Sequence, residues 1–167
     1  MADAFDDILR ANERFAATFR QPGTQGQAAR GLALITCMDA RLDPLAMLGL
    51  NPGDAVLLRN AGARVTDDVL RTLILATRLL EVTRILVLAH THCRMTTVTD
   101  RQLHDTMWRT ASLDTRSLNF DTIADQQEAL AGDVQRIRSS PFLADDLAVS
   151  GGTYNLDTGL IEILTSA

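Results

Sequence analysis

Two cysteines and one histidine in this chain have the residue types and spacing of zinc ligands. His90 and Cys93 are three residues apart, so both side chains can reach one ion across a turn. Cys37 is the only other cysteine and can supply a third ligand. A catalytic zinc site has three protein ligands, often thiolate or imidazole, and an open fourth position. The alternative is two buried free thiols that pack as small hydrophobes, and the spacing alone favours neither interpretation.

The residues that follow Cys37 favour the metal site. Asp39 and Arg41 lie two and four residues beyond it, a spacing that allows a charge-assisted pair beside the ion. A carboxylate there can accept a hydrogen bond from a metal-bound hydroxide, or it can occupy the open coordination position itself. The alternative is an ordinary surface ion pair, which contributes little to stability.

The elements around these residues have the pattern of an α/β fold. Short apolar runs predict buried strands over residues 31–36, 55–60 and 84–90. Helical spacing and capping residues predict helices over residues 3–19, 42–50, 67–80 and 121–140, and residues 147–164 are predicted to form a strand and a C-terminal β-hairpin. The alternation implies a mainly parallel β-sheet flanked by helices, in which ligands bind at the carboxyl ends of the strands. Cys37 and His90 both lie at such ends. The polar region 96–119 is left without an assignment.

The composition excludes several classes of function. A chain of 167 residues fits one domain, residues 1–167, and all 16 cationic side chains are arginine, which excludes lysine chemistry. The net charge of −5 does not favour binding to nucleic acid. No segment has the roughly 18 consecutive apolar residues that a membrane span needs. The N-terminus lacks the pattern of a signal peptide, and two cysteines make no disulfide framework. We therefore expect a cytoplasmic protein with a small-molecule substrate.

Three motifs in a fixed order carry a family resemblance. They are Cys37-x-Asp39-x-Arg41, Asn60-Ala61-Gly62 and His90-x-x-Cys93. This combination resembles the β-class carbonic anhydrases, most strongly over residues 31–95, and the short chain is similar to the compact bacterial members.

The resemblance implies a zinc enzyme. Cys37, His90 and Cys93 would hold one Zn²⁺ per chain, and the reaction would be the reversible hydration of carbon dioxide to bicarbonate. Zinc-bound hydroxide would be the nucleophile. Asp39, oriented by Arg41, would hold that hydroxide in position, although family members also have a closed state in which the aspartate ligates zinc.

The resemblance also implies a homodimer or a dimer of dimers. In this family the N-terminal helix, here residues 3–19, packs on a partner subunit. The active site then lies at or near the subunit interface.

Two residues depart from the family pattern. His92 and Arg94 stand where members commonly have aspartate and glycine. Because glycine permits an unusual backbone, we expect Arg94 to constrain this turn. The adjacent geometry disfavours His92 as a fourth ligand and favours a solvent-facing or interface position, where it can assist proton transfer.

Other functions stay open, and the departures at His92 and Arg94 support only the first of them. One is a catalytically weak or silent zinc-binding homologue, and another is a related zinc lyase or hydrolase such as a carbon disulfide hydrolase. A thiol redox protein is disfavoured because the chain has no Cys-x-x-Cys motif.

Four residues near the motifs have expected structural roles. Arg59 and Asn60 end the second strand and are expected to orient loops near the site. Asp43 is expected to cap the helix that follows it. Packing explains Trp108, the single tryptophan.

Overall fold

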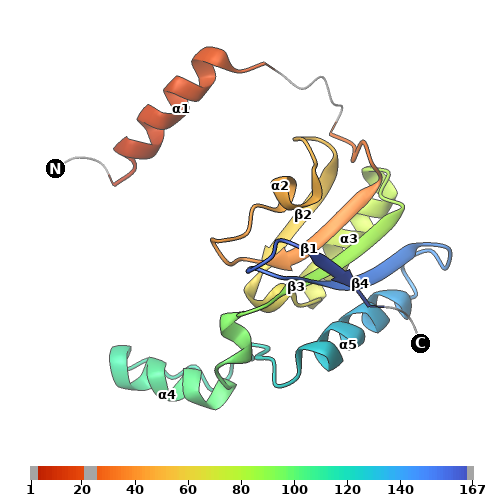
Figure 1. The fold of residues 1–167 in the computed structure, drawn as a ribbon. Coiled ribbons are helices and arrows are strands. Elements are labelled where there is room, and N and C mark those ends of the chain that lie inside the picture. The colour runs from red at the N-terminus through yellow and green to blue at the C-terminus, as the bar shows by residue number, and fades with distance from the viewer. Residues whose placement is uncertain (1–3, 21–25, 165–167) are drawn as a thin grey trace.

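The structure, a computed structural model, describes residues 4–20 and 26–164 (Figure 1). Its centre is a five-stranded sheet with the strand order β2-β1-β3-β4-β5. The strands are β1 (Leu32–Cys37), β2 (Ala55–Asn60), β3 (Arg84–His90), β4 (Ala148–Tyr154) and β5 (Ile161–Ile163). The first four strands are parallel, and β5 pairs antiparallel with β4. The predicted mainly parallel sheet and C-terminal hairpin are therefore confirmed.

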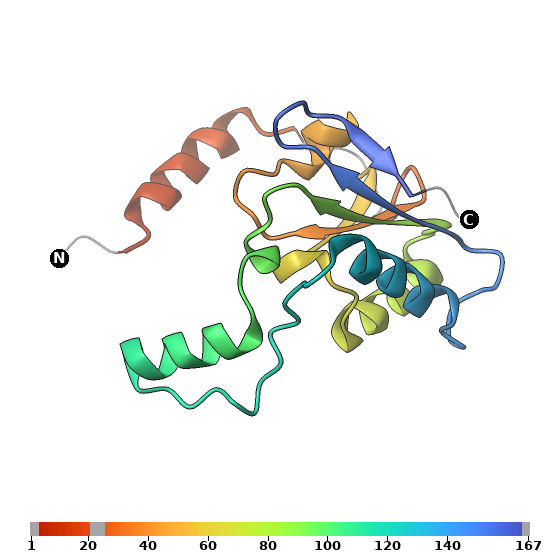
Figure 2. The ribbon, with the colours of Figure 1, turned by 60° about the horizontal axis from the view of Figure 1, so that its bottom comes forward.

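Helices and two short 3-10 turns connect the strands. They are α1 (Asp6–Thr18), α2 (Pro44–Leu48), η1 (Ala61–Ala63), α3 (Asp67–Leu79), η2 (Arg94–Thr96), α4 (Asp100–Ala111) and α5 (Gln126–Arg138). Figure 2 shows α3 and α5 against one face of the sheet. The main apolar core lies between this face and the two helices. None of the helices in the described ranges is long and apolar enough to cross a membrane.

The central and edge strands differ in burial. Every residue of β1 is buried, as the continuous apolar run predicts for a strand with neighbours on both sides. The same prediction for residues 55–60 is wrong. β2 is an edge strand whose only partner is β1, and Leu57 and Arg59 are exposed. Apolar composition alone does not distinguish an edge strand from a central one.

Capping side chains set where the helices begin. Asp43 accepts a hydrogen bond from the backbone N–H of Ala46 at 3.2 Å, which confirms its role as the cap of α2. The helix predicted over 121–140 begins later, at Gln126, because the carboxylate of Asp125 caps its first turn. The unassigned region 96–119 contains α4, which starts with a capping box formed by Thr99 and Gln102.

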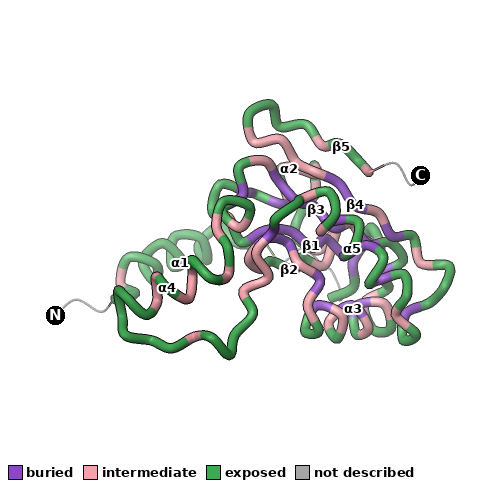
Figure 3. The backbone as a smooth tube through the Cα atoms, turned by 90° about the horizontal axis from the view of Figure 1, so that it is seen from below, coloured by how far each residue is buried: buried purple, intermediate pink, exposed green. Residues whose placement is uncertain are grey.

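Two helices lie outside the core. Neither α1 nor α4 contains a buried residue, and both project from the sheet on the same side (Figures 2 and 3). The exposed large apolar side chains of these regions are Phe5, Ile8, Leu9, Phe15, Phe19, Trp108, Leu113 and Leu118. Trp108 is 63% exposed, so the expectation that packing explains it is wrong for a single chain.

Substitution of Leu73, the fully buried leucine of α3, tests how α3 packs on the sheet. Leu73 is fully buried between α3 and the sheet, so Leu73→Ala should lower the free energy of unfolding by about 2–5 kcal/mol through lost contacts and a cavity. Leu79→Ala, in the same helix but at a side chain that is 66% exposed, should change it by less than about 0.5 kcal/mol. Urea denaturation followed by circular dichroism measures both. Equal effects in the two variants would contradict the described packing.

Candidate metal centre

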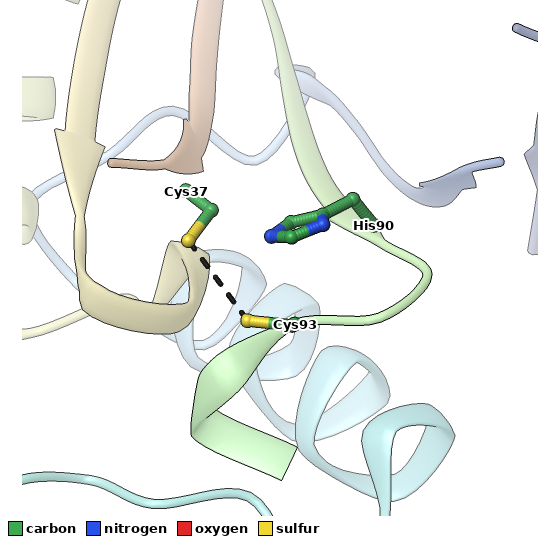
Figure 4. A group of neighbouring side chains, drawn as sticks. All are labelled: Cys37, His90 and Cys93. Carbon is green, nitrogen blue, oxygen red and sulfur yellow. Dashed lines mark hydrogen bonds between the residues drawn. The ribbon is translucent and has the colours of Figure 1, made fainter. Parts of the chain in front are cut away.

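Three side chains converge at the carboxyl edge of the sheet. Cys37 ends β1, His90 ends β3, and Cys93 follows in the next loop (Figure 4). Their ligand atoms lie within 4.8 Å of one another, and all three residues are buried. The two sulfur atoms are 3.9 Å apart. Thiolates bound at about 2.3 Å in a tetrahedral zinc site lie roughly 3.8 Å apart, so this spacing fits the ion.

The hydrogen bond of His90 leaves one ring nitrogen free to bind a metal. Nδ1 lies 2.8 Å from the carbonyl oxygen of Thr91. A carbonyl only accepts, so Nδ1 carries the proton and Nε2 presents a lone pair. Nε2 is the one buried side-chain polar atom without a hydrogen-bond partner in the described ranges. Leaving such an atom unpaired costs about 1–3 kcal/mol, and a bound cation would remove that cost.

The two thiols do not ionise equally. The hydrogen bond with Cys93 holds the pKa of Cys37 below its usual range, and contacts with His90 and with backbone N–H groups act in the same direction. The hydrogen bond with Cys37, together with burial, raises the pKa of Cys93. The two thiols share one hydrogen bond, which favours a single thiolate in the pair, so metal binding to both sulfur atoms must release at least one proton.

Asp39 and Arg41 form a bidentate ion pair beside this cluster. Arg41 donates from Nε to Oδ1 at 2.9 Å and from one terminal nitrogen to Oδ2 at 2.7 Å. These bonds hold the pKa of Asp39 well below its usual range, so the carboxylate is an acceptor at neutral pH. Oδ2 also lies 3.9 Å from Nε2 of His90. The dyad is thus paired and next to the ligand cluster.

Arginine side chains hold the loops that carry these residues. Arg59 donates to the carbonyl oxygen of Cys37 at 3.0 Å and to that of Asp39 at 2.7 Å. Arg41 donates to the carbonyl oxygen of His92 at 3.1 Å. The expected loop-orienting role of Arg59 is confirmed, and Arg41 joins the loops that follow β1 and β3.

Two further polar side chains brace the site. Asn60 binds both backbone groups of Arg64, which closes the turn around Gly62, a residue with φ of +82°. Gln126, at the start of α5, donates to the carbonyl oxygen of His90 at 2.9 Å. Asn60 was expected to orient a loop and does so. Gln126 was missed, because nothing in the sequence links residues 36 positions apart.

The turn after His90 contains the two residues that depart from the family pattern, His92 and Arg94. Nε2 of His92 lies 3.0 Å from Oδ2 of Asp157, and its side chain is 62% exposed. The prediction that it faces solvent instead of the metal is confirmed. The strained residue is His92 itself, with φ of +56°, whereas Arg94 begins η2 with a negative φ. Arg94 has the backbone of an ordinary non-glycine residue, so its constraint on the turn stays a prediction.

Comparison with known proteins agrees with this geometry. The carbonic anhydrase family model matches residues 32–161. β-Carbonic anhydrase 1 of Mycobacterium tuberculosis is 35% identical over 160 residues, which cover 96% of this chain and 97% of that protein. The chain belongs to the β-carbonic anhydrase family. The family that the motifs resemble, and the assignment as an enzyme of this type, are thereby confirmed.

Two other relatives help to compare the fold and the activity of this family member. The crystal structure of the carbonic anhydrase from Streptococcus mutans superposes with a TM-score of 0.92 at 33% identity and covers 99% of both chains. A carbon disulfide hydrolase of Saccharolobus solfataricus is 44% identical over 66 residues, which is 40% of this chain and 32% of that protein. The overall fold is thus shared with a solved carbonic anhydrase, and part of the sequence with a protein of another activity.

Metal content tests the ligand cluster. The purified protein should contain one zinc per chain, and Cys93→Ala should lose it because two ligands do not hold the ion. His92→Asn is the control, since asparagine tolerates a positive φ and His92 faces away from the cluster. Elemental analysis after dialysis measures all three. Full zinc content in Cys93→Ala, or its loss in His92→Asn, would contradict the assignment.

Proposed function

We propose that this protein catalyses the reversible hydration of carbon dioxide to bicarbonate with one zinc ion held by Cys37, His90 and Cys93. The observation that carries the proposal is the buried, unpartnered Nε2 of His90, which shares its small space with two sulfur atoms. The carboxylate of Asp39, which pairs with Arg41, lies beside this nitrogen, with Oδ2 3.9 Å from Nε2 of His90. This donor set fits zinc, and the family supports the reaction.

Zinc, when bound, lowers the pKa of its water ligand and so supplies a nucleophile near neutral pH. Asp39, kept ionised by Arg41, would accept a hydrogen bond from a nucleophile held at the ligand cluster and so orient it toward carbon dioxide. Arg41 holds the carboxylate at two points, so Asp39 cannot rotate freely. Hydration of carbon dioxide by this nucleophile would give bicarbonate, and the proton of the original water would leave to solvent.

Carbon disulfide hydrolysis is the second candidate. The match to a carbon disulfide hydrolase over 66 residues favours it, and the two substrates are both linear triatomic molecules. The same nucleophile would attack either carbon. Access to the metal would decide between them, so both substrates belong in one assay.

The charge of Asp39 tests the proposed mechanism. Asp39→Asn should retain zinc and lower kcat/KM for carbon dioxide hydration by about 10²–10³-fold, because an amide is a weaker acceptor and lacks the charge that Arg41 orients. Asp43→Asn is the matched control, since asparagine also caps α2. Stopped-flow hydration rates from about pH 6.5 to 9 provide the measurement.

Three results of this assay would contradict the proposed hydration of carbon dioxide by this mechanism. Unchanged kcat/KM in Asp39→Asn would remove the dyad from the mechanism. Turnover of carbon disulfide without hydration of carbon dioxide would favour the second candidate. One zinc per chain with no turnover of either substrate would indicate a silent homologue.

We also propose a homodimer or a dimer of dimers in which α1 packs on the partner subunit. The apolar side chains of α1 support this, because none is buried within the chain. Leu9 and Phe15 are 55% and 60% exposed, although both are large hydrophobes. Burying such a stripe against a second copy would remove it from water.

Charged substitutions on α1 test the assembly. Leu9→Asp with Phe15→Asp should convert the dimer to a monomer, because a buried carboxylate cannot be solvated at the interface. Glu13→Gln, in the same helix, should leave the dimer intact. Sedimentation velocity measures both proteins. A wild-type monomer with full activity would contradict the proposal.

The ligand thiols also bear on location, and we propose the cytoplasm. Cys37 and Cys93 are both free, and their sulfur atoms are 3.9 Å apart. An oxidising compartment would favour a disulfide between them and would thereby remove two metal ligands. A reducing compartment keeps both available.

A further inference from the structure

A cavity lies at the opposite end of the sheet from the ligand cluster of Cys37, His90 and Cys93. It has a volume of about 710 Å³ and is lined by the first residues of three strands, Leu32, Arg84 and Ala148. The ends of α2 and α5 complete it. Figure 1 shows β1 and β3 running in the same direction, so their carboxyl ends, where Cys37 and His90 lie, and their amino ends, where Leu32 and Arg84 line the cavity, are at opposite edges of the sheet. The cavity therefore takes no part in the proposed reaction.

Three arginines converge on this cavity without a carboxylate among its lining residues. They are Arg30, Arg84 and Arg138. Arg30 forms an ion pair with Asp54, with Nε 3.6 Å from Oδ2, whereas in the described ranges Arg84 and Arg138 form none. The whole chain has a net charge of −5, so a local excess of positive charge runs against its composition. All three arginines are exposed, so solvent screens their repulsion in part, and an anion bound between them would reduce it further.

The arginines are held in place while most of their donors stay free. Nε of Arg84 donates to the carbonyl oxygen of Arg30 at 3.3 Å, and one terminal nitrogen of Arg138 donates to that of Val149 at 2.7 Å. Each guanidinium has five N–H donors, so the others remain for a ligand. Such donors match the two oxygens of a carboxylate or phosphate.

The remaining lining of the cavity is mostly apolar. Five leucines and a serine are among the lining residues: Leu32, Leu48, Leu50, Leu86, Leu147 and Ser150. Concave sites of about 300–1,000 Å³ with apolar walls and a few convergent polar groups are typical of small-molecule binding. A bare inorganic ion would leave the leucines exposed to water, whereas a purely apolar ligand would leave the arginines unpaired.

We propose that this cavity binds a small free organic anion, with a carboxylate or phosphate group on the arginines and an apolar body against the leucines. Octanoate and octyl phosphate are the probes, because each combines the two features. Isothermal titration should give one site per chain with a Kd below about 1 mM for at least one of them. Acetate and inorganic phosphate lack the apolar body, and octanol lacks the charge, so each should bind at least about tenfold more weakly.

Substitution of the arginines locates the site. Arg84→Gln with Arg138→Gln should weaken binding of the probe at least about tenfold, because two charge-assisted contacts are lost. Arg84→Gln alone should weaken it less and guards against misfolding of the double variant. Arg71→Gln with Arg109→Gln, on the exposed faces of α3 and α4, is the matched control and should bind normally. Carbon dioxide hydration should be unchanged in every variant, which separates this proposal from the proposed activity.

Several results would overturn the proposal. One is the absence of binding by both probes, and another is equal affinity in the double variant and its control. A third is a cavity already covered by a second copy of the chain. That arrangement would show as no binding by the wild type together with a changed sedimentation coefficient in the double variant.

Discussion

Parallel pairing of β1 with β3 is the constraint on which the cluster of candidate ligands Cys37, His90 and Cys93 depends. The register aligns Thr36 with Leu88, so the ends of both strands reach the same edge of the sheet. Cys37 and His90 are more than 50 residues apart in the chain but become neighbours there. The turn after His90 then places the sulfur atom of Cys93 beside that of Cys37. A shift of the register by one residue would turn these side chains toward opposite faces and would separate the ligands.

The environment of the cluster combines a buried ligand set with a more exposed charged pair. His90 is 1% exposed, so its unpaired nitrogen is costly without a metal. The side chain of Arg41 is 54% exposed, and an ion pair at such a position adds little stability to the fold. Its bidentate geometry instead fixes the direction of the Asp39 carboxylate. Burial thus defines the metal site, and hydrogen-bond geometry defines where the acceptor points.

The surface of the single chain has two regions that its own core does not explain. One is the apolar side of α1, which we propose contacts a partner subunit, and the exposed apolar residues around α4 lie on the same side of the sheet. The other is the arginine-lined cavity at the amino ends of the strands, which has both charge and apolar walls. Their chemistry differs, since the first lacks a concentration of one charge and the second has three arginines. A second copy suits the first, and a small anion suits the second.

Local pattern in the sequence was sufficient for much of this description. Continuous apolar runs located β1 and β3, Asp43 marked the start of α2, and the order of the motifs indicated the ligands and the dyad. The strands and the cap depend on residues that are close in the chain, where propensity, capping and hydrophobic pattern act directly, whereas the ligands and the dyad were indicated by the family resemblance of the ordered motifs. They therefore could be predicted before any contact between distant segments was known.

Other features depended on contacts between segments far apart in the chain. Only the sheet order made β2 an edge strand, and only the approach of α5 brought Gln126 to the carbonyl oxygen of His90. The positive φ of His92 and its contact with Asp157 likewise involve the C-terminal hairpin, 65 residues away. Such contacts depend on how whole elements pack, which no local pattern encodes. The sequence by itself determined which residues carry the chemistry, and the tertiary structure decided what holds them in place.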